Sequence, residues 1–340
     1  MKKTSKIMSL VLAGAMVLSM TACAGNTAET TSAAAKTQET AADTASKAEE
    51  TTGAEASESE TAAKAEGTTY KIGVLQLVQH TALDAANDGF IAALDDAGIA
   101  YEVDQQNASG DQSACQTVAS KFANEKKDLI LAIATPAAQA MVGAVEDTPV
   151  LITAVTDPAE SGLVDTNEKP GANVTGTSDL TPVKEQIDLL KQLVPEAKTV
   201  GVLYCSAESN SKIQADMAKE AIAAAGMESK EYTVSSSNEI QTVVQSMVGA
   251  VDAVYAPTDN VIAAGMATVG MVAGDNNLPV ICGEAGMVQN GGLATYGIDY
   301  YQLGYMTGQQ AVKILTEGAS PADMPIEYLP AEKCELTVNE

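Results

Sequence analysis

The feature that most constrains the fold of this chain is a regular alternation of strand-like and helix-like segments over residues 71–282. The first unit is typical of the rest. An apolar run at residues 72–78 predicts a buried strand, a polar break follows at 79–81, and apolar residues then recur at helical spacing as far as Leu94. Strands that feed directly into helices form right-handed βαβ units and parallel sheets. The pattern therefore predicts an α/β fold.

The expected elements fall into two series that resemble each other. In the first series we expect strands at 71–77, 101–105, 129–133, 150–155 and 173–178, and helices at about 82–97, 112–124 and 136–145. In the second we expect strands at 199–204, 230–234, 252–256 and 279–282, and helices at 208–225, 238–248 and 260–273. Each series contains a strand, a polar or proline break, a helix of small residues and then a Pro-Val strand. This repetition predicts two doubly wound lobes of one architecture.

Segments that leave each series are expected to join the two lobes. Residues 174–181 leave the first series, residues 292–300 leave the second, and a helix at about 300–317 and a strand at 334–338 follow. Several crossing segments make a hinge with a cleft between the lobes. We expect the N-terminal lobe to comprise 69–178 and 297–320, and the C-terminal lobe 179–296 and 321–340.

The N-terminal segment predicts export and a membrane anchor. Residues 1–23 combine three lysines, an apolar stretch too short for a comfortable membrane span, and small residues before Cys23. This ending resembles the lipobox of bacterial lipoproteins, which implies a lipidated Cys23. An ordinary secretory signal that is cut near Ala22 or Ala24 is the alternative. Residues 24–68 are acidic and contain no Val, Ile, Leu or Phe, so we expect a disordered linker.

Composition excludes several classes of function. A formal charge of −26 argues against a nucleic-acid partner, which requires a basic face. The only histidine is His80, so neither a Ser-His-Asp triad nor a multi-histidine metal site is available. The sequence has no phosphate-binding loop or nucleophile elbow. We expect no cofactor and no metal. The four later cysteines match no Cys-x-x-Cys pattern and leave their pairing open: Cys115, Cys205, Cys282 and Cys334.

Four short motifs are far more specific for one protein family in combination than any of them is alone. TAVTDP, SAESNS, PTDN and GIDYYQLG lie within a stretch from about Tyr70 to Val338, and this stretch resembles the ABC-transporter substrate-binding lipoproteins of the tryptophan/tyrosine-import type. The resemblance implies a type I periplasmic-binding-protein fold with two Rossmann-like lobes that close over a small solute. It also implies an aromatic amino acid or a related compound as ligand and a membrane permease as partner.

Polar side chains follow the predicted strands at the edge where ligands of such sheets bind. In the first lobe the candidates are Gln79, His80, Thr81, Thr135, Thr156 and Asp157, and in the second they are Tyr204, Glu208, Ser209, Asn210, Asp259, Asn260 and Glu284. Helix N-termini and hydroxyls favour a ligand carboxylate. Asp259, Glu208 or Asp157 would accept hydrogen bonds from an ammonium group. The plainer alternatives are helix caps for the threonines, a solvated loop for His80 and core packing for Tyr204.

We therefore expect a monomeric, extracytoplasmic binding protein that is anchored through Cys23 and delivers an amino acid, of the aromatic class, to an ABC permease. Two alternatives belong to other classes. A sugar or nucleoside could bind to the same fold, although the chain has no Trp and only two Phe residues. An exported hydrolase could use a carboxylate pair such as Glu208 and Asp259 as general acid and base. The sequence does not separate a transport role from a sensing role.

Overall fold

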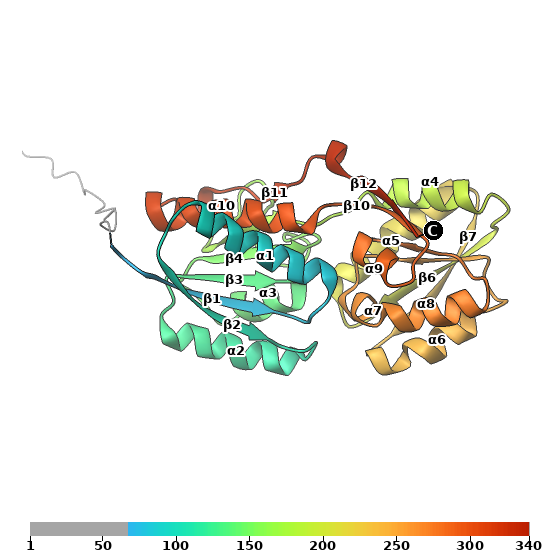
Figure 1. The fold of residues 1–340 in the computed structure, drawn as a ribbon, viewed down its shortest axis with the longest axis horizontal. Helices are drawn as coiled ribbons and strands as arrows, with labels where there is room; N and C mark the ends of the chain where they lie inside the picture. The colour runs from blue at the N-terminus through green and yellow to red at the C-terminus, as the bar shows by residue number, and fades with distance from the viewer. Residues whose placement is uncertain (1–66, 340) are drawn as a thin grey trace, which may run out of the picture. The chain divides into compact units, whose positions relative to one another are not determined.

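The structure is a computed structural model that describes residues 67–339. The predicted signal peptide, the lipidated Cys23 and almost all of the predicted linker lie outside the described residues. The described part contains two six-stranded sheets, both flanked by helices (Figure 1). The predicted α/β class with two lobes is confirmed. None of the helices in residues 67–339 is both long enough and apolar enough to span a bilayer.

The first sheet has the strand order β11-β5-β4-β3-β1-β2, and every neighbouring pair in it is parallel. Its strands are β1 (Tyr70–Gln76), β2 (Tyr101–Asn107), β3 (Leu129–Ile133), β4 (Val150–Val155), β5 (Val174–Ser178) and β11 (Glu327–Tyr328). Its helices are α1 (Thr81–Asp96), α2 (Gln112–Glu125), α3 (Thr135–Val142) and α10 (Tyr300–Glu317). Helices α1 and α10 cover one face of this sheet, and α2 and α3 cover the other (Figure 1).

The second sheet repeats this order as β12-β10-β9-β8-β6-β7, with only the β10–β12 pair antiparallel. Its strands are β6 (Thr199–Cys205), β7 (Glu228–Val234), β8 (Ala253–Ala256), β9 (Val280–Cys282), β10 (Ala294–Gly297) and β12 (Glu335–Val338). Its helices are α4 (Val183–Leu193), α5 (Ser209–Ala224), α6 (Ile240–Met247), α7 (Asn260–Ala264), α8 (Met266–Asp275) and α9 (Ala285–Gln289). Three short 3₁₀ turns complete the described chain at Ser237–Glu239, Pro321–Asp323 and Ala331–Lys333.

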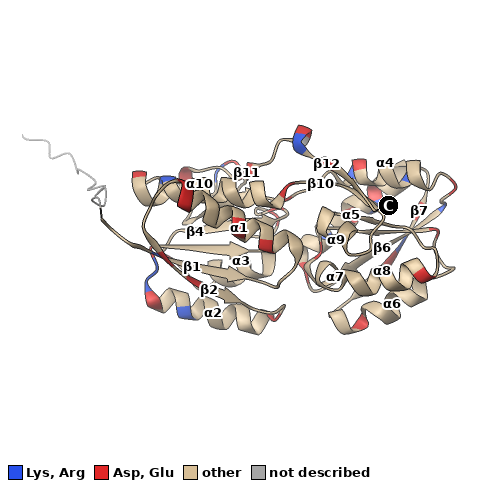
Figure 2. Ribbon diagram, in the orientation of Figure 1, with Lys and Arg blue, Asp and Glu red and all other residues tan. Residues whose placement is uncertain are grey.

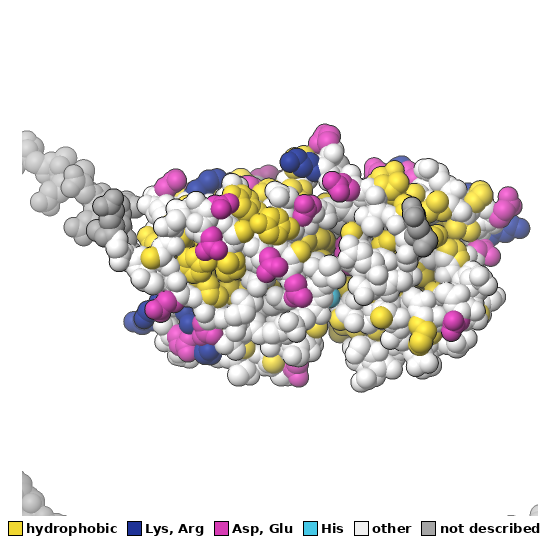
Figure 3. Space-filling view, viewed as in Figure 1, with side chains coloured by type: hydrophobic (Ala, Val, Ile, Leu, Met, Phe, Trp, Pro, Cys, Tyr) yellow, Lys and Arg dark blue, Asp and Glu magenta, His cyan; other side chains and the backbone are white. Residues whose placement is uncertain are grey.

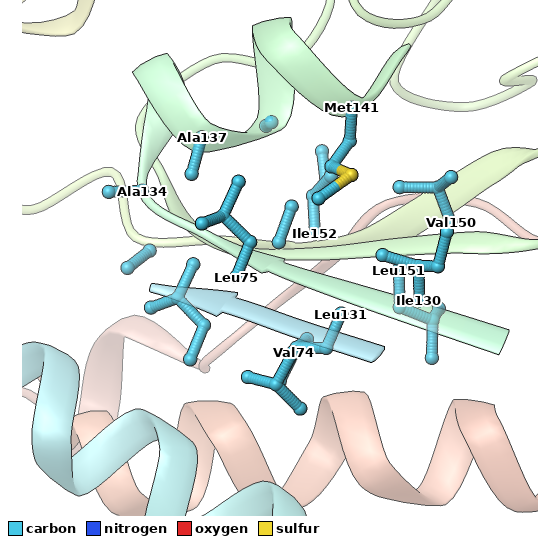
Figure 4. Close-up of a cluster of buried hydrophobic side chains, with 14 of the residues drawn as sticks. Val74, Leu75, Ile130, Leu131, Ala134, Ala137, Met141, Val150, Leu151 and Ile152 are labelled. Atoms are coloured by element: carbon cyan, nitrogen blue, oxygen red, sulfur yellow. The ribbon is translucent and has the colours of Figure 1, made fainter. Parts of the chain in front are cut away.

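Side chains alternate across each sheet and so build a core on both faces. In the first sheet Leu75 points toward Met141 of α3, whereas Val74 and Leu131 point to the opposite face (Figure 4). In the second sheet Val202 packs with α4 and α5, and its neighbour Leu203 packs with α6 and α8. Strands that are buried on both faces explain the continuous apolar runs in the sequence. The helices on the two faces of each sheet therefore determine which side chains of a strand point to which layer.

Several predicted elements differ from the observed ones. The single helix expected at 260–273 is two helices, α7 and α8, which meet at Gly265. Gly265 has ψ near 9°, and a Cβ there would collide with Ile240. The sequence also predicts that 321–340 lies wholly in the second lobe, but β11 pairs with β5 in the first sheet and only β12 joins the second. The chain crosses back before its last strand, so this stretch is shared by both lobes.

Three segments cross between the two sheets: 179–182, 298–299 and 329–334. A multi-strand hinge was predicted, and the two sheets are joined in this way. Outside these segments the surface is strongly acidic. Acidic side chains lie among scattered apolar ones over α1 and α10 (Figure 3), in keeping with the formal charge of −26.

Candidate functional site

Polar groups from both lobes meet in one buried cavity. They lie where strands β1, β4, β5, β6, β8 and β9 end, because the carboxyl edges of both sheets face it. The lining residues are His80, Leu83, Ala154, Thr156, Asp179, Asn210, Thr258, Asp259, Asn260, Ala263, Glu284 and Tyr300. The free volume is about 10 Å³, which is roughly the space of one water molecule. The lobes are therefore nearly in contact here.

In the second lobe a carboxylate organises two amides. Glu208, directly after β6, accepts hydrogen bonds through Oε2 from Asn260 Nδ2 at 2.7 Å and from Asn210 Nδ2 at 3.1 Å. Glu208 and Asn210 are buried at 4% and 3% exposure. These bonds fix both amide orientations, because the NH₂ group of each must face the carboxylate. Asn210 Oδ1 is left buried without a partner.

Two other acids of this lobe cap helices. Asp259 precedes α7, and its Oδ1 accepts a bond from Ile262 N at 2.8 Å while its Oδ2 accepts one from Cys205 N at 2.5 Å. Glu284 precedes α9 and accepts bonds from the backbone N–H groups of Gly286 and Met287. N-capping satisfies N–H groups that have no partner inside the helix. Both oxygens of each carboxylate are therefore already engaged within their own lobe.

Asp179 differs from these acids because it belongs to a crossing segment. It follows β5, is 4% exposed, and accepts a 2.7 Å bond through Oδ2 from the Tyr300 hydroxyl. Tyr300 begins α10 directly after another crossing segment, so this bond ties two parts of the hinge together. Asp179 Oδ1 has no partner of its own although it is buried. It is the acidic oxygen in the cavity that remains available to a ligand among the described residues.

Two hydrogen bonds join the lobes across the cavity. Gln214 Nε2 of α5 donates to Thr156 Oγ1, which follows β4, at 2.9 Å. His80 Nε2, which precedes α1, lies 3.4 Å from Asn260 Oδ1. The amide oxygen can only accept, so Nε2 carries the proton in this contact. Burial lowers the pKa of His80 and so favours the neutral ring, in which Nδ1 is left as an acceptor. His80 Nδ1 is buried and unpaired.

Burial without a positive neighbour dominates the electrostatics. Desolvation raises the pKa of Asp179 to about 6, although the hydrogen bond from Tyr300 lowers it in part. Desolvation and then the nearby Asp259 raise the pKa of Glu208 to about 7. Burial also raises the pKa of Glu284 to about 7 and lowers the pKa of His80. A cation that binds beside such a carboxylate stabilises its charged form, which burial alone disfavours.

The cavity has no lysine and no arginine side chain. None of its lining residues is a lysine, and the whole sequence contains no arginine. Figure 2 shows no blue segment on α1, α7 or α9, three of the helices that begin beside the cavity. Within residues 67–339 no group of three or more His, Cys, Asp and Glu side chains is placed to hold a metal ion. The cysteines in this range are free thiols, with only Cys334 partly exposed.

The structure brings some of the predicted site residues together and leaves others apart. Six of them line the cavity: His80, Thr156, Asn210, Asp259, Asn260 and Glu284. Glu208 lies directly behind them, through its bonds to Asn210 and Asn260. The carboxylates of Asp259 and Glu284 cap helices, so two residues that were predicted to bind the ligand also serve as N-caps.

The remaining predicted residues lie elsewhere. Gln79 is exposed, and Thr81 is the first residue of α1 rather than its cap. Thr135 is buried at the start of α3 but does not line the cavity. Asp157 orders its own loop by accepting bonds from Ala159 N, Glu160 N and Asn167. Ser209 is exposed, and Tyr204 packs in the core with its hydroxyl on Glu231.

Three residues at the cavity escaped the sequence analysis as candidates: Asp179, Tyr300 and Gln214. Asp179 and Tyr300 stand in or beside segments that the analysis treated as linkers. A usable signal was available, because Asp179 directly follows a strand. Polar residues just after the carboxyl ends of parallel strands are expected to bind ligands, which we call the strand-end rule. Gln214 lies within α5, where nothing in the sequence marks it.

Comparison with known proteins gives consistent matches. The profile of the family described as ABC transporter substrate binding protein matches residues 71–340. A tyrosine-binding protein of Clostridioides difficile is 41% identical over the whole of this chain and 92% of its own length. The fold is similar to an ABC domain from Streptococcus pneumonia in complex with L-Trp, at 39% identity and a TM-score of 0.77, covering 80% of this chain and 92% of that one.

A second solved structure differs in its state. It is a ligand-free, open substrate-binding protein with adhesive properties from Clostridium difficile, and it is 47% identical over 80% of this chain and 92% of its own. Its TM-score is only 0.62. The chain is therefore closer in shape to the L-Trp complex than to the open structure, although it is less similar to the former in sequence. Domain closure changes shape without changing fold, and the lower TM-score to the open structure agrees with the small free volume between the lobes of this chain.

Proposed function

This chain belongs to the family of ABC transporter substrate-binding proteins, with the type I periplasmic-binding-protein fold, and on that premise we propose that it captures an aromatic amino acid between its lobes. Members of this family bind a solute without transforming it, so the chain is a binding component and not an enzyme. It acts outside the cytoplasm. Under our proposal it delivers the amino acid to an ABC permease in the membrane.

The observation that carries the ligand class is the unpaired Asp179 Oδ1 in the cavity between the lobes. A buried carboxylate oxygen without a donor is costly, and an α-ammonium group would supply one through a charge-assisted hydrogen bond. Asp179 takes the role that the sequence analysis assigned to Asp259, Glu208 or Asp157. Asp259 and Asp157 are engaged in caps and loop bonds, and Glu208 holds two amides.

The likeness to a tyrosine-binding protein and to an L-Trp complex supports an aromatic side chain on the ligand. Leu83, Ala263 and the Tyr300 ring offer apolar contact at the cavity. The present free volume of about 10 Å³ is too small for such a ligand, since ligand pockets measure about 300 Å³ or more. We infer that the lobes separate to admit the amino acid and close again upon it.

The membrane anchor and the oligomeric state belong to the same proposal. We propose that Cys23 is lipidated and holds the protein at the outer face of the cell membrane, on the strength of the lipobox-like sequence alone. We propose that the protein acts as a monomer, in which the two lobes of one chain form both walls of the cavity.

A thermal-shift panel tests the ligand class. Purified full-length protein is heated with each of the amino acids, with sugars and with nucleosides. A ligand at a hundred times its Kd stabilises the folded state by about 2.7 kcal/mol, so we expect L-tyrosine and L-tryptophan to raise the melting temperature most. A response to sugars or nucleosides with none to amino acids would assign the site to another ligand class. A chemically altered hit in mass spectrometry would contradict a pure binding role.

A further inference from the structure

The unpaired polar atoms at the cavity are all hydrogen-bond acceptors. Three lining residues have a buried side-chain atom without a partner: Asp179 Oδ1, Asn210 Oδ1 and His80 Nδ1. Asn210 is held in this orientation because its NH₂ group donates to Glu208 and to Ser211 Oγ. His80 Nδ1 is an acceptor because Nε2 faces the oxygen of Asn260. Three acceptors match the three N–H donors of a primary ammonium group.

Donors for a carboxylate are scarce by comparison. The hydroxyls of Thr156 and Thr258 each accept a bond from Gln214, which leaves one O–H on each as a donor. No lysine lines the cavity, and the chain has no arginine, the residue best suited to bidentate carboxylate binding. A ligand carboxylate would also lie among the acids Asp179, Glu208, Asp259 and Glu284, which are all buried. Like charges in such a site repel each other.

We propose that this site recognises its ligand through the ammonium group and accordingly also binds arylalkylamines, the decarboxylated counterparts of aromatic amino acids. The inference rests on the proposed function, since it assigns an aromatic ligand to the same cavity. The carboxylate of an amino acid then contributes little to affinity. An aromatic acid that lacks the amine is rejected, because it leaves three buried acceptors unpaired and adds a negative charge.

Calorimetric titration of the full-length protein with three matched ligands tests this. The ligands are L-tyrosine, tyramine and 3-(4-hydroxyphenyl)propanoate, which share one ring and differ only in the charged groups. We expect the Kd of tyramine to lie within about tenfold of that of tyrosine. We expect the propanoate to bind at least about a hundredfold more weakly, as expected when buried polar groups lose their partners.

The outcomes separate this inference from the proposed function. Tyrosine binding together with tyramine that binds no more tightly than the propanoate would overturn the inference alone. Tyramine binding without any binding of tyrosine or tryptophan would overturn the proposed function and leave the inference standing. If none of these ligands binds, both fail.

A pair of variants locates the effect. Asp179→Asn keeps the size of the side chain and removes the charge, so we expect the Kd of tyramine to rise about tenfold to a hundredfold. Glu160→Gln is the control. It removes one negative charge from an exposed side chain that does not line the cavity, and we expect an unchanged Kd. Thermal unfolding of both variants establishes that they fold. Folded Asp179→Asn that binds tyramine as tightly as the wild type would contradict the inference.

Discussion

The two lobes share one strand order but present different chemistry at the edge where they meet. The first lobe contributes His80 and Thr156, both neutral. The second contributes the acids Glu208, Asp259 and Glu284. Because the sheets are alike in topology, the difference comes entirely from the residues that follow the strands. The fold fixes where the site lies, and the strand ends decide what it binds.

The comparison also separates acids that serve structure from the acid that is free to bind. Asp259 and Glu284 use both carboxylate oxygens to accept bonds from backbone N–H groups, and Glu208 holds two amides through Oε2, all within their own lobe. Asp179 lies between the lobes in a crossing segment and keeps one oxygen without a partner. A group at the hinge can therefore respond both to a ligand and to closure.

The largest expected effect concerns how each lobe packs its helices. In the first lobe, a Cβ at Gly304 of α10 would collide with the backbone carbonyl of Ala86 in α1. Gly304→Ala should lower the free energy of unfolding by about 3 kcal/mol through overpacking. In the second lobe nothing lies near Gly274 of α8, so Gly274→Ala should be stabilising by about 0.5 to 1 kcal/mol. Urea unfolding measures both, and equal stabilities would contradict the close packing of α1 on α10.

A smaller effect is the pH dependence of stability, which should differ between a buried acid and a surface acid. The folded pKa of Asp179 is raised to about 6, so between its ordinary pKa and that value the native state binds more protons than the unfolded state. The stability that this carboxyl contributes is therefore greatest below pH 4 and is lost as the pH rises through 6. Relative to Asp179→Asn, the wild type should lose about 2 kcal/mol of unfolding free energy between pH 4 and pH 8.

Asp104 provides the opposite sign as a control. Burial acts to raise its pKa, but bonds from Lys121, Gln106 and Lys127 outweigh this and hold the pKa below its usual range. The stability from Asp104 is therefore present above its ordinary pKa and lost as the pH falls. Urea unfolding relative to the wild type should therefore show the effect of Asp179→Asn change between pH 4 and pH 8, and the effect of Asp104→Asn change in the opposite direction below pH 4. Parallel trends would mean that Asp179 is not buried as described.

The smallest expected effect tests a contact between the lobes. Thr156→Val removes the acceptor for Gln214 Nε2, which stabilises the closed state by about 1 kcal/mol. The Kd of L-tyrosine should rise about fivefold in consequence. Thr135→Val is the matched control, because the buried Thr135 hydroxyl has no partner and does not line the cavity. Calorimetric titration measures the Kd of both variants. Equal changes in Kd would contradict a contribution of the Thr156–Gln214 bond to closure.

Much of the fold could be predicted from the sequence, because strands buried on both faces leave apolar runs that are easy to recognise. The strand-end rule also found His80, Asn210 and Asn260. It gave no means to separate Asp259, which is engaged in a cap, from an acid with a free oxygen. That distinction depends on which N–H groups the fold brings to each carboxylate. Asp179 was missed because strand β5, with its Thr and Ser residues, leads into what was read only as a linker.

The break at Gly265 and the position of β11 were missed for similar reasons. The small residues around Gly265 are compatible with a continuous helix. The feature that disfavours one is a tertiary contact with the side chain of Ile240 from another helix. The pairing of β11 with β5 joins residues about 150 positions apart, and its strand has only two residues. Contacts at such separation leave no local pattern to detect.

The most direct test of the central claim is the number of protons released when L-tyrosine binds. Titration calorimetry at pH 6 in two buffers of different ionisation enthalpy gives this number. If the ammonium group of the ligand meets Asp179, that carboxyl must ionise. Its pKa of about 6 leaves it half protonated at pH 6, so about half a proton should leave for each tyrosine bound. Equal apparent enthalpies in the two buffers, or an uptake of protons, would contradict an ammonium group held by this carboxylate.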